Sequence, residues 1–330
     1  MARRDFRQLG LADSIVQRRG KKSAWLDRLD AALDWPAMET IVAGIHASRE
    51  GGLSCPLLTY VKLLLLQQWY GLSDEGLEAA VDDRLSFRRF AGIPLAEAVP
   101  DHSSIWRFRE ELAKRGLAEP LLAEVNRQLD AKGLILRRGT LIDATILEAA
   151  VRPPGGDAGE VSGRDPQAGW TKKNGKSRFG YKAHAAVDEG SGLVRKAVMT
   201  PADVHDSVMG DGLVQGDEEA VYADKAGACP PAREAGLGDS AERRAGLRAR
   251  GIAPRIMYQA RRNRPLRPWQ VAFNKAVAPV RAGVERLFAT MKQAYGYRQV
   301  RYLGLARNSV QLQLLCAAIN LRRALALGLT

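Results

Sequence analysis

Residues 140–147 read Thr-Leu-Ile-Asp-Ala-Thr-Ile-Leu, a short apolar run that is interrupted by one carboxylate, Asp143. A run of this length and composition is typical of a buried β-strand. Burying a carboxylate costs free energy unless the group is paired or bound to a metal ion. We therefore expect a strand here and treat Asp143 as a candidate functional residue, with a salt-bridged acid at a strand end as the alternative.

The chain after this strand predicts further strands and helices. Residues 152–178 are rich in Gly, Pro, Lys and Asp and predict an exposed loop. Two strands are predicted at 180–188 and 193–200, because Glu189-Gly-Ser-Gly between them is a hairpin signal. We also predict a helix from about residue 205, strands at 220–224 and 255–258, and helices at 279–294 and 305–325. This order of elements is the plan of a ribonuclease-H-like fold, an α/β fold with a mixed sheet flanked by helices.

Two further acids stand in distinctive places. Asp224 ends a predicted apolar strand, which is where open α/β sheets place ligands. Glu285 lies on a predicted helix and is the only acid in residues 243–330, a stretch with 18 Lys and Arg residues. Arg281 and Lys292 fall on the same side of that helix, beside an apolar stripe that would pack on the sheet.

Together Asp143, Asp224 and Glu285 suit a metal site for phosphodiester chemistry. Two divalent ions roughly 3.5–4 Å apart stabilise the attacking and leaving oxygens of an in-line displacement. Magnesium prefers oxygen ligands and keeps several waters, so a few carboxylates suffice. Taken singly, the two aspartates are also consistent with salt-bridged strand acids, and Glu285 with an i, i+4 pair to Arg281.

The first part of the chain predicts short helices. We expect them at 57–69, 73–83, 86–90 and 105–114, because apolar residues recur there at helical spacing and Pro56, Ser73 and Asp101 suit helix starts. Short helices with tight turns resemble a helix-turn-helix module. Five arginines would face phosphate: Arg84, Arg88, Arg89, Arg107 and Arg109. A helical bundle with solvated arginines is the alternative.

Three parts of the chain follow from these patterns. Residues 1–50 form an N-terminal segment that we expect to be partly ordered, because it contains Trp25 and Trp35. Residues 51–135 form an all-α, helix-turn-helix-like DNA-binding domain. Residues 136–330 form a ribonuclease-H-like catalytic domain that includes the exposed loop 152–178.

Composition narrows the class of protein. The 330 residues carry a net charge of +13, which suggests a nucleic-acid partner, although an acidic membrane surface would satisfy it too. Cys55, Cys229 and Cys316 lie far apart, so the sequence predicts neither a zinc site nor a disulfide framework. A membrane span needs about 20 apolar residues and a signal peptide needs an apolar stretch, and we expect neither.

Six segments resemble the insertion-sequence-five family of bacterial DDE transposases, over about residues 50–325. They are 100–109, 139–146, 179–184, 222–225, the set Arg281, Glu285 and Lys292, and 301–308. The family motif has an arginine four residues before its glutamate and a lysine seven residues after it, and both are present. The family often has a tyrosine three residues before that arginine; Ala278 stands there, which puts in doubt an aromatic role and not the metal site.

The resemblance implies a transposase that cleaves DNA at the ends of an insertion element and transfers the freed 3′-hydroxyls into target DNA. It implies that Asp143, Asp224 and Glu285 are catalytic and bind two Mg²⁺ ions, with Mn²⁺ as a substitute. The implied partners are double-stranded DNA, both terminal inverted repeats and target, and a second copy of the chain in a synaptic homodimer. The implied location is the bacterial cytoplasm, at the nucleoid and without a membrane partner.

Ten residues are candidate DNA contacts: Arg281, Lys292, Lys182, His184, Arg301, Lys172, Lys173, Ser103, Ser104 and Arg107. The resemblance implies that Arg281 and Lys292 hold phosphates or terminal bases. A hydrogen-bonded strand histidine is the alternative for His184, and plain N-capping is the alternative for Ser103, Ser104 and Arg107. For Trp170, in the predicted exposed loop, DNA contact and core packing are the two alternatives.

Other functions compete with transposition. A ribonuclease-H-like, structure-specific DNA nuclease would use the same metal site but would cut without joining. A catalytically silent regulator derived from a transposase would bind DNA and would be free to lose an acid, yet all three acids are present. An RNA-binding protein would explain the charge but not the acids in apolar strands.

Overall fold

The computed structural model describes residues 24–45, 55–153, 162–173, 175–224, 239–260 and 265–329. The chain divides into two compact units, one of residues 1–132 and 313–330 and one of residues 133–312. Residues 1–23 and 46–50 of the predicted N-terminal segment, parts of the predicted loop 152–178, and Lys225 of the resemblance lie outside the described residues.

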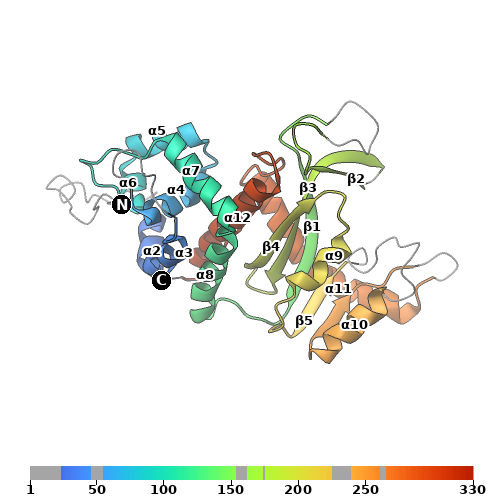
Figure 1. The fold of residues 1–330 in the computed structure, drawn as a ribbon. Helices are drawn as coiled ribbons and strands as arrows, with labels where there is room; N and C mark the ends of the chain where they lie inside the picture. Colours follow the sequence, from blue (N-terminus) through green and yellow to red (C-terminus); the bar gives the residue numbers. More distant parts are fainter. Residues whose placement is uncertain are drawn as a thin grey trace. The chain divides into compact units, whose positions relative to one another are not determined.

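The first unit is helical (Figure 1). Its helices are α2 (Ala24–Ala32), α3 (Trp35–Val42), α4 (Leu57–Tyr70), α5 (Asp74–Asp83), α6 (Leu85–Ala91), α7 (His102–Arg115) and α8 (Ala118–Ala131), and it takes in the end of α12 (Leu305–Ala326). In α4, 11 of the 14 residues are buried, so this helix forms the core of the unit. Trp25 and Trp35, the basis for expecting order near the N-terminus, stack edge-on against Trp69 and Phe90.

The predicted helix ends are confirmed by their capping contacts. Ser73 accepts a hydrogen bond from the Gly76 backbone N–H at 2.9 Å, and Asp101 accepts one from the Ser104 N–H at 2.6 Å. Gly71 ends α4 in the left-handed conformation that a helix C-terminus favours, with φ of 65°. Helices α2, α3 and α8 have no counterpart in the sequence prediction.

The prediction that five arginines face phosphate is wrong for two of them, Arg88 and Arg109. Arg88 is buried and donates hydrogen bonds to the backbone carbonyls of Pro94 and Glu97. Arg109 is buried and donates two hydrogen bonds to Asp74, at 2.8 and 2.5 Å. Guanidinium groups can form such planar, paired bonds inside a protein, so an arginine on a helix is no sure sign of a surface charge.

The second unit is built on a mixed sheet. Its strands are β1 (Thr140–Glu148), β2 (Gly169–Lys173), β3 (Lys176–Asp188), β4 (Val194–Pro201), β5 (Ala220–Ala223) and β6 (Ala253–Ile256). Strands β4, β3 and β1 are antiparallel neighbours, and β5 and β6 follow β1 in parallel; β2 pairs with the first residues of β3. This is the ribonuclease-H-like order that the sequence predicts.

Helices flank this sheet (Figure 1). They are α9 (Asp206–Gly210), α10 (Asp239–Ala249), α11 (Pro268–Gln293) and the start of α12, with a 3-10 turn at Asp211–Leu213. Helix α11 packs against β1, β3 and β5 through an apolar stripe that includes Val284, Leu287 and Met291. The stripe confirms the predicted buried side of this helix. None of the helices in the described ranges is long and apolar enough to cross a membrane.

Two predictions about this unit are wrong in extent. Residues 169–173 and 176–178, expected in an exposed loop, form the hairpin of β2 and β3. Its residues are mostly exposed, so they lack the apolar alternation that reveals a strand. Helix α11 begins at Pro268 and contains Pro279, which the prediction took as its first turn. In the sequence, either proline suits the first turn of a helix, but in the structure only Pro268 lies there.

We predict that the full chain carrying Arg109→Ala is destabilised by about 3–5 kcal/mol, because Asp74 loses its buried partner. Urea unfolding followed by circular dichroism measures this loss. Arg107→Ala is the matched control: it is exposed on the same helix, and its effect should stay within about 0.5 kcal/mol. Equal effects of the two changes would contradict a structural role for Arg109.

Candidate active site

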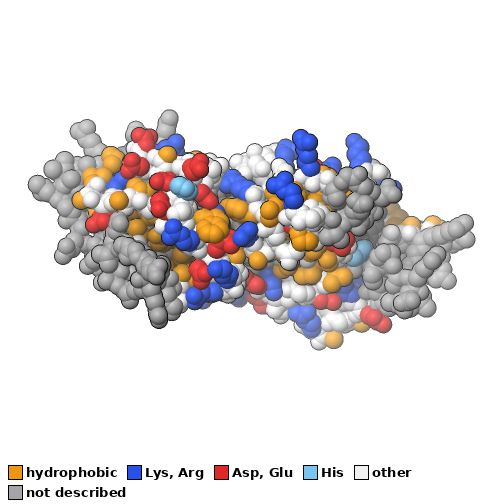
Figure 2. All heavy atoms as spheres, turned by 45° about the horizontal axis from the view of Figure 1, so that its top comes forward, with side chains coloured by type: hydrophobic (Ala, Val, Ile, Leu, Met, Phe, Trp, Pro, Cys, Tyr) orange, Lys and Arg blue, Asp and Glu red, His pale blue; other side chains and the backbone are white. Residues whose placement is uncertain are grey.

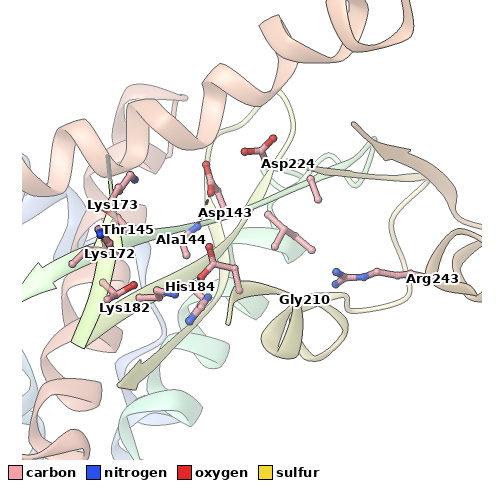
Figure 3. A pocket seen from close by; sticks show the side chains of 15 residues that line it. Asp143, Ala144, Thr145, Lys172, Lys173, Lys182, His184, Gly210, Asp224 and Arg243 are labelled. Carbon is pink, nitrogen blue, oxygen red and sulfur yellow. Dashed lines mark hydrogen bonds and ion pairs between the residues drawn. The ribbon is translucent and has the colours of Figure 1, made fainter. Parts of the chain in front are cut away.

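Asp143 and Asp224 lie side by side because of the register between β1 and β5. The two strands are parallel, and Ile142 pairs with Ala223. The residue that follows each of these two is an aspartate, so Asp143 and Asp224 lie at the same level of the sheet. Figure 3 shows both side chains projecting to the same side of the strands. The structure therefore brings together two of the three predicted carboxylates.

Helix α11 supplies a cation to both aspartates. The Arg281 guanidinium donates a hydrogen bond from Nη2 to Asp143 Oδ2 at 2.7 Å, and its Nη1 lies 3.8 Å from Asp224 Oδ1. Asp143 Oδ1 also accepts a hydrogen bond from the Ala144 N–H at 2.8 Å. Arg281 was expected to contact DNA, and here it is buried with its charge directed at the two carboxylates.

The pKa of Asp143 reflects the carboxylates and the arginine that surround it. Burial raises the pKa of Asp143, and the nearby carboxylates of Asp224 and Asp206 raise it further. Arg281 and the Ala144 N–H act in the opposite direction and lower this pKa. Carboxylates gathered in a partly buried place are stabilised by protonation or by a nearby cation, and in this structure Arg281 is that cation.

The residues present fit a divalent ion in part. Carboxylate oxygens are the ligands that magnesium prefers, and the side chains of Asp143 and Asp224 remain 25% and 34% exposed. Glu285 is exposed, one helical turn after Arg281, and its side chain makes no hydrogen bond or ion pair with the residues that the structure describes. Within those residues, no three His, Cys, Asp or Glu side chains are arranged to hold a metal ion.

Asp206, at the start of α9, is a member of this site that the sequence did not reveal. Its carboxylate lies 3.0 Å from Lys182 Nζ, and Lys182 also donates a hydrogen bond to the Val204 carbonyl at 2.8 Å. Only the fold brings residue 206 to Asp143, since α9 packs against β1. Asp206 partly neutralises Lys182, one of the predicted DNA contacts.

His184 is a hydrogen-bonded strand histidine, the alternative considered from sequence. It is 1% exposed, and its Nε2 lies 2.8 Å from Thr200 Oγ1. Burial lowers the pKa of His184 to about 4, with Asp206 opposing this shift and Lys182 adding to it. The ring is therefore neutral at physiological pH and forms part of the wall of the site rather than a surface contact.

A cavity of about 310 Å³ opens over these residues (Figure 3). Asp143, Asp206 and Asp224 line it, together with the predicted contacts Lys172, Lys173, Lys182 and His184, and with Thr145 and Arg243. Of the other predicted contacts in this unit, Lys292 lines a neighbouring cavity, and Arg301 is exposed outside both.

The three predicted contacts of the helical unit lie at the start of α7. The Ser103 hydroxyl donates a hydrogen bond to Asp101 at 3.0 Å, and Arg107 donates one to Ser103 at 2.8 Å. The Ser104 backbone N–H completes the cap. Asp101, and neither serine, is thus the N-cap of α7, and DNA contact by Ser103, Ser104 and Arg107 stays a prediction.

Comparison with known proteins gives two family matches. A model described as "Transposase DDE domain" matches residues 135–321, which is more than half of the chain. A second, described as "Transposase domain (DUF772)", matches residues 14–111. Among solved structures, a pre-cleavage Mos1 transpososome aligns over 94% of this chain and 97% of its own, at 9% identity and a TM-score of 0.20, which is too low to support an argument.

We predict that Arg281→Ala destabilises the metal-free chain by about 1.5–3 kcal/mol, because two neighbouring carboxylates lose their shared cation. Added MgCl₂ should recover more stability in this variant than in the parent chain, since a divalent ion replaces the missing charge. Thermal unfolding in EDTA and in MgCl₂ measures both effects.

The matched control for this experiment is Arg286→Ala, an exposed arginine on the same helix. Its unfolding temperature should match that of the parent in both buffers. If Arg281→Ala gains no more from magnesium than the control does, the two aspartates are not a cation site.

Proposed function

The chain belongs to the DDE transposase family, and we propose that it cleaves DNA at the ends of an insertion element and joins the freed ends to target DNA. Membership rests on the match over residues 135–321. As a transposase the chain acts on DNA, and the family uses divalent metal ions. The observation that carries the proposal is the pair Asp143 and Asp224, held at one level of the sheet beside a cavity lined by lysines.

We propose Asp143, Asp224 and Glu285 as the ligands of Mg²⁺. When bound, divalent ions supply the charge that stabilises the attacking and leaving oxygens of an in-line phosphoryl transfer. The two aspartates already lie together, while the exposed side chain of Glu285 would have to turn towards them from the next turn of α11. Asp206 adds a fourth carboxylate whose place near Lys182 favours a positioning role.

Arg281 has two roles in this proposal. Without metal it neutralises the two aspartates, as its contacts at 2.7 and 3.8 Å indicate. With metal present, the guanidinium becomes free to hold a phosphate of the bound DNA, for which its paired donors are suited. The lysines on the other side of the cavity, Lys172 and Lys173, are exposed and would contact the backbone of the same DNA.

The finer assignments are also proposals. We place the chain in the insertion-sequence-five family, on the motifs of the resemblance. We assign recognition of the element's ends to residues 51–135 and the chemistry to residues 136–330. Two ends must be held together for joining, so we propose a homodimer as the active form, working at the nucleoid of a bacterial cell.

We predict metal-dependent nicking and joining by the purified chain on a labelled duplex that carries the element's end, with a supercoiled plasmid as target. Asp143→Asn, Asp224→Asn and Glu285→Gln should each lower both products by more than about 100-fold, because each removes part of the charge that stabilises the transition state. Gel analysis in MgCl₂ and in EDTA measures the products.

Glu242→Gln is the control, since it changes an exposed carboxylate on α10 that lines neither cavity. It should leave both products unchanged. Nicking without joined product would support the nuclease alternative. DNA binding without cleavage, in the parent and in all variants, would support a silent regulator and refute the catalytic proposal.

A further inference from the structure

A second cavity, of about 510 Å³, lies beside the first and is lined mainly by cations. Its residues are Ile146, Glu148, Lys173, Lys176, Arg178, Lys292 and Arg298. Ile146 and Lys173 line both cavities, so the two are continuous along β1. Five basic side chains thus face a single carboxylate. We call this the basic cavity.

Three separate parts of the second unit build the basic cavity. The hairpin of β2 and β3 brings Lys173 and Lys176 opposite each other across its turn. Helix α11 contributes Lys292 from its last turn. The segment after α11 is fixed to the end of β1, because the Glu148 N–H donates to the Arg298 carbonyl at 3.1 Å and the Val300 N–H donates to the Glu148 carbonyl at 2.9 Å.

The charges of the basic cavity are poorly balanced. Arg178 pairs with Glu148 at 3.1 Å, but both side chains are exposed, so this ion pair contributes little. Burial lowers the pKa of Lys292, and the neighbouring Lys173, Arg178 and Arg298 lower it further. A fixed arrangement of like charges costs free energy that a bound anion recovers.

In Figure 2 several Lys and Arg side chains project over the part of the second unit where Figure 1 places β2 and β3. A single small anion would need two or three donors. The cations instead continue from the first cavity, through Lys173, to the far side of the basic cavity. Such a row of charges suits a chain of phosphates.

The length of β1 gives the register of that chain of phosphates. Asp143 and Glu148 are five residues apart on one strand, which at about 3.3 Å per residue is roughly 16 Å. A strand of B-form DNA rises about 3.4 Å per nucleotide along the helix axis and also winds around it, so a straight distance of this size spans about two to three nucleotides.

We propose that the basic cavity binds backbone phosphates of the DNA strand that is cut, about two to three nucleotides from the cleaved phosphate, with Lys176, Arg178 and Arg298 as contacts. The inference rests on the proposed function, because it takes the neighbouring pair of aspartates as the place of cleavage. Its ligand is a DNA backbone, read by charge and not by base sequence.

The first test measures binding without cleavage. The labelled duplex with the element's end is titrated in EDTA at several salt concentrations, with the parent chain, Lys176→Ala and Arg298→Ala. Each variant should lower the slope of log Kd against log salt concentration by about 0.9, the value for one lost phosphate contact. Both side chains are exposed, so the thermal unfolding of the variants should match that of the parent.

Lys275→Ala is the matched control. This exposed lysine lies on α11, as Lys292 does, but lines neither cavity. It should retain the salt dependence of the parent. Slopes that are equal in the parent, both variants and the control would overturn the proposal, whether or not the chain cleaves DNA.

The second test locates the phosphates. Single methylphosphonates, which remove one backbone charge, are placed about one to five nucleotides from the cleavage point. The parent should lose about 3- to 5-fold in affinity at one or two of these positions, and Arg298→Ala should lose none at the position that Arg298 contacts, since that contact is already absent. Equal losses in the two proteins would overturn the assignment.

The outcomes separate this inference from the proposed function. A chain that fails to nick DNA but shows the position-dependent loss refutes catalysis and supports a phosphate site in the basic cavity. If the chain nicks and joins DNA but Lys176→Ala and Arg298→Ala do not change binding, the proposed function is supported and the phosphate site is refuted. Tighter binding of duplex RNA, weakened equally by both variants, would overturn DNA as the ligand.

Discussion

The contact between Arg281 and the two aspartates links helix α11 to strand β1 and to the residue that follows β5. Asp143 and Asp224 are neighbours only because β1 and β5 run in parallel with Ile142 opposite Ala223. Neighbouring carboxylates repel each other, and the Arg281 guanidinium, which lies close to both, offsets this repulsion. Arg281 lies on the same buried side of α11 as Val284, Leu287 and Met291, whereas Glu285 is exposed.

Strand β1 organises both the chemistry and the charge of this unit. Its middle carries Asp143, and its end holds the segment that contains Arg298 through backbone hydrogen bonds of Glu148. Because side chains on one strand keep fixed spacings, the acidic and basic regions cannot shift relative to each other without breaking the sheet. With the aspartates as the proposed cleavage site and the basic cavity as the proposed phosphate site, this fixed spacing would select one bond in a repetitive polymer.

Sequence patterns predicted the features that depend on local physics. The apolar run around Asp143, the turn between β3 and β4, and the caps at Ser73 and Asp101 all follow from burial, turn chemistry and unpaired backbone groups. Features set by distant contacts were missed: Arg109 is buried because Asp74 meets it from another helix, and Asp206 reaches the site only through the packing of α9. The exposed hairpin of β2 and β3 buries little and so leaves no periodic signal.

The exposed position of Glu285 follows from the charge balance of the site without metal. Arg281 and Glu285 are separated by one turn of α11, about 6 Å along its axis, so both can approach the same aspartates. Near two carboxylates, a cation is attracted and a third carboxylate is repelled. A divalent ion held by the two aspartates, as proposed, would reverse this preference, because its positive charge would weaken their attraction for Arg281 and attract Glu285. We infer that the helix presents two alternative partners to one acidic pair, and that the charge between the aspartates determines which of them is used.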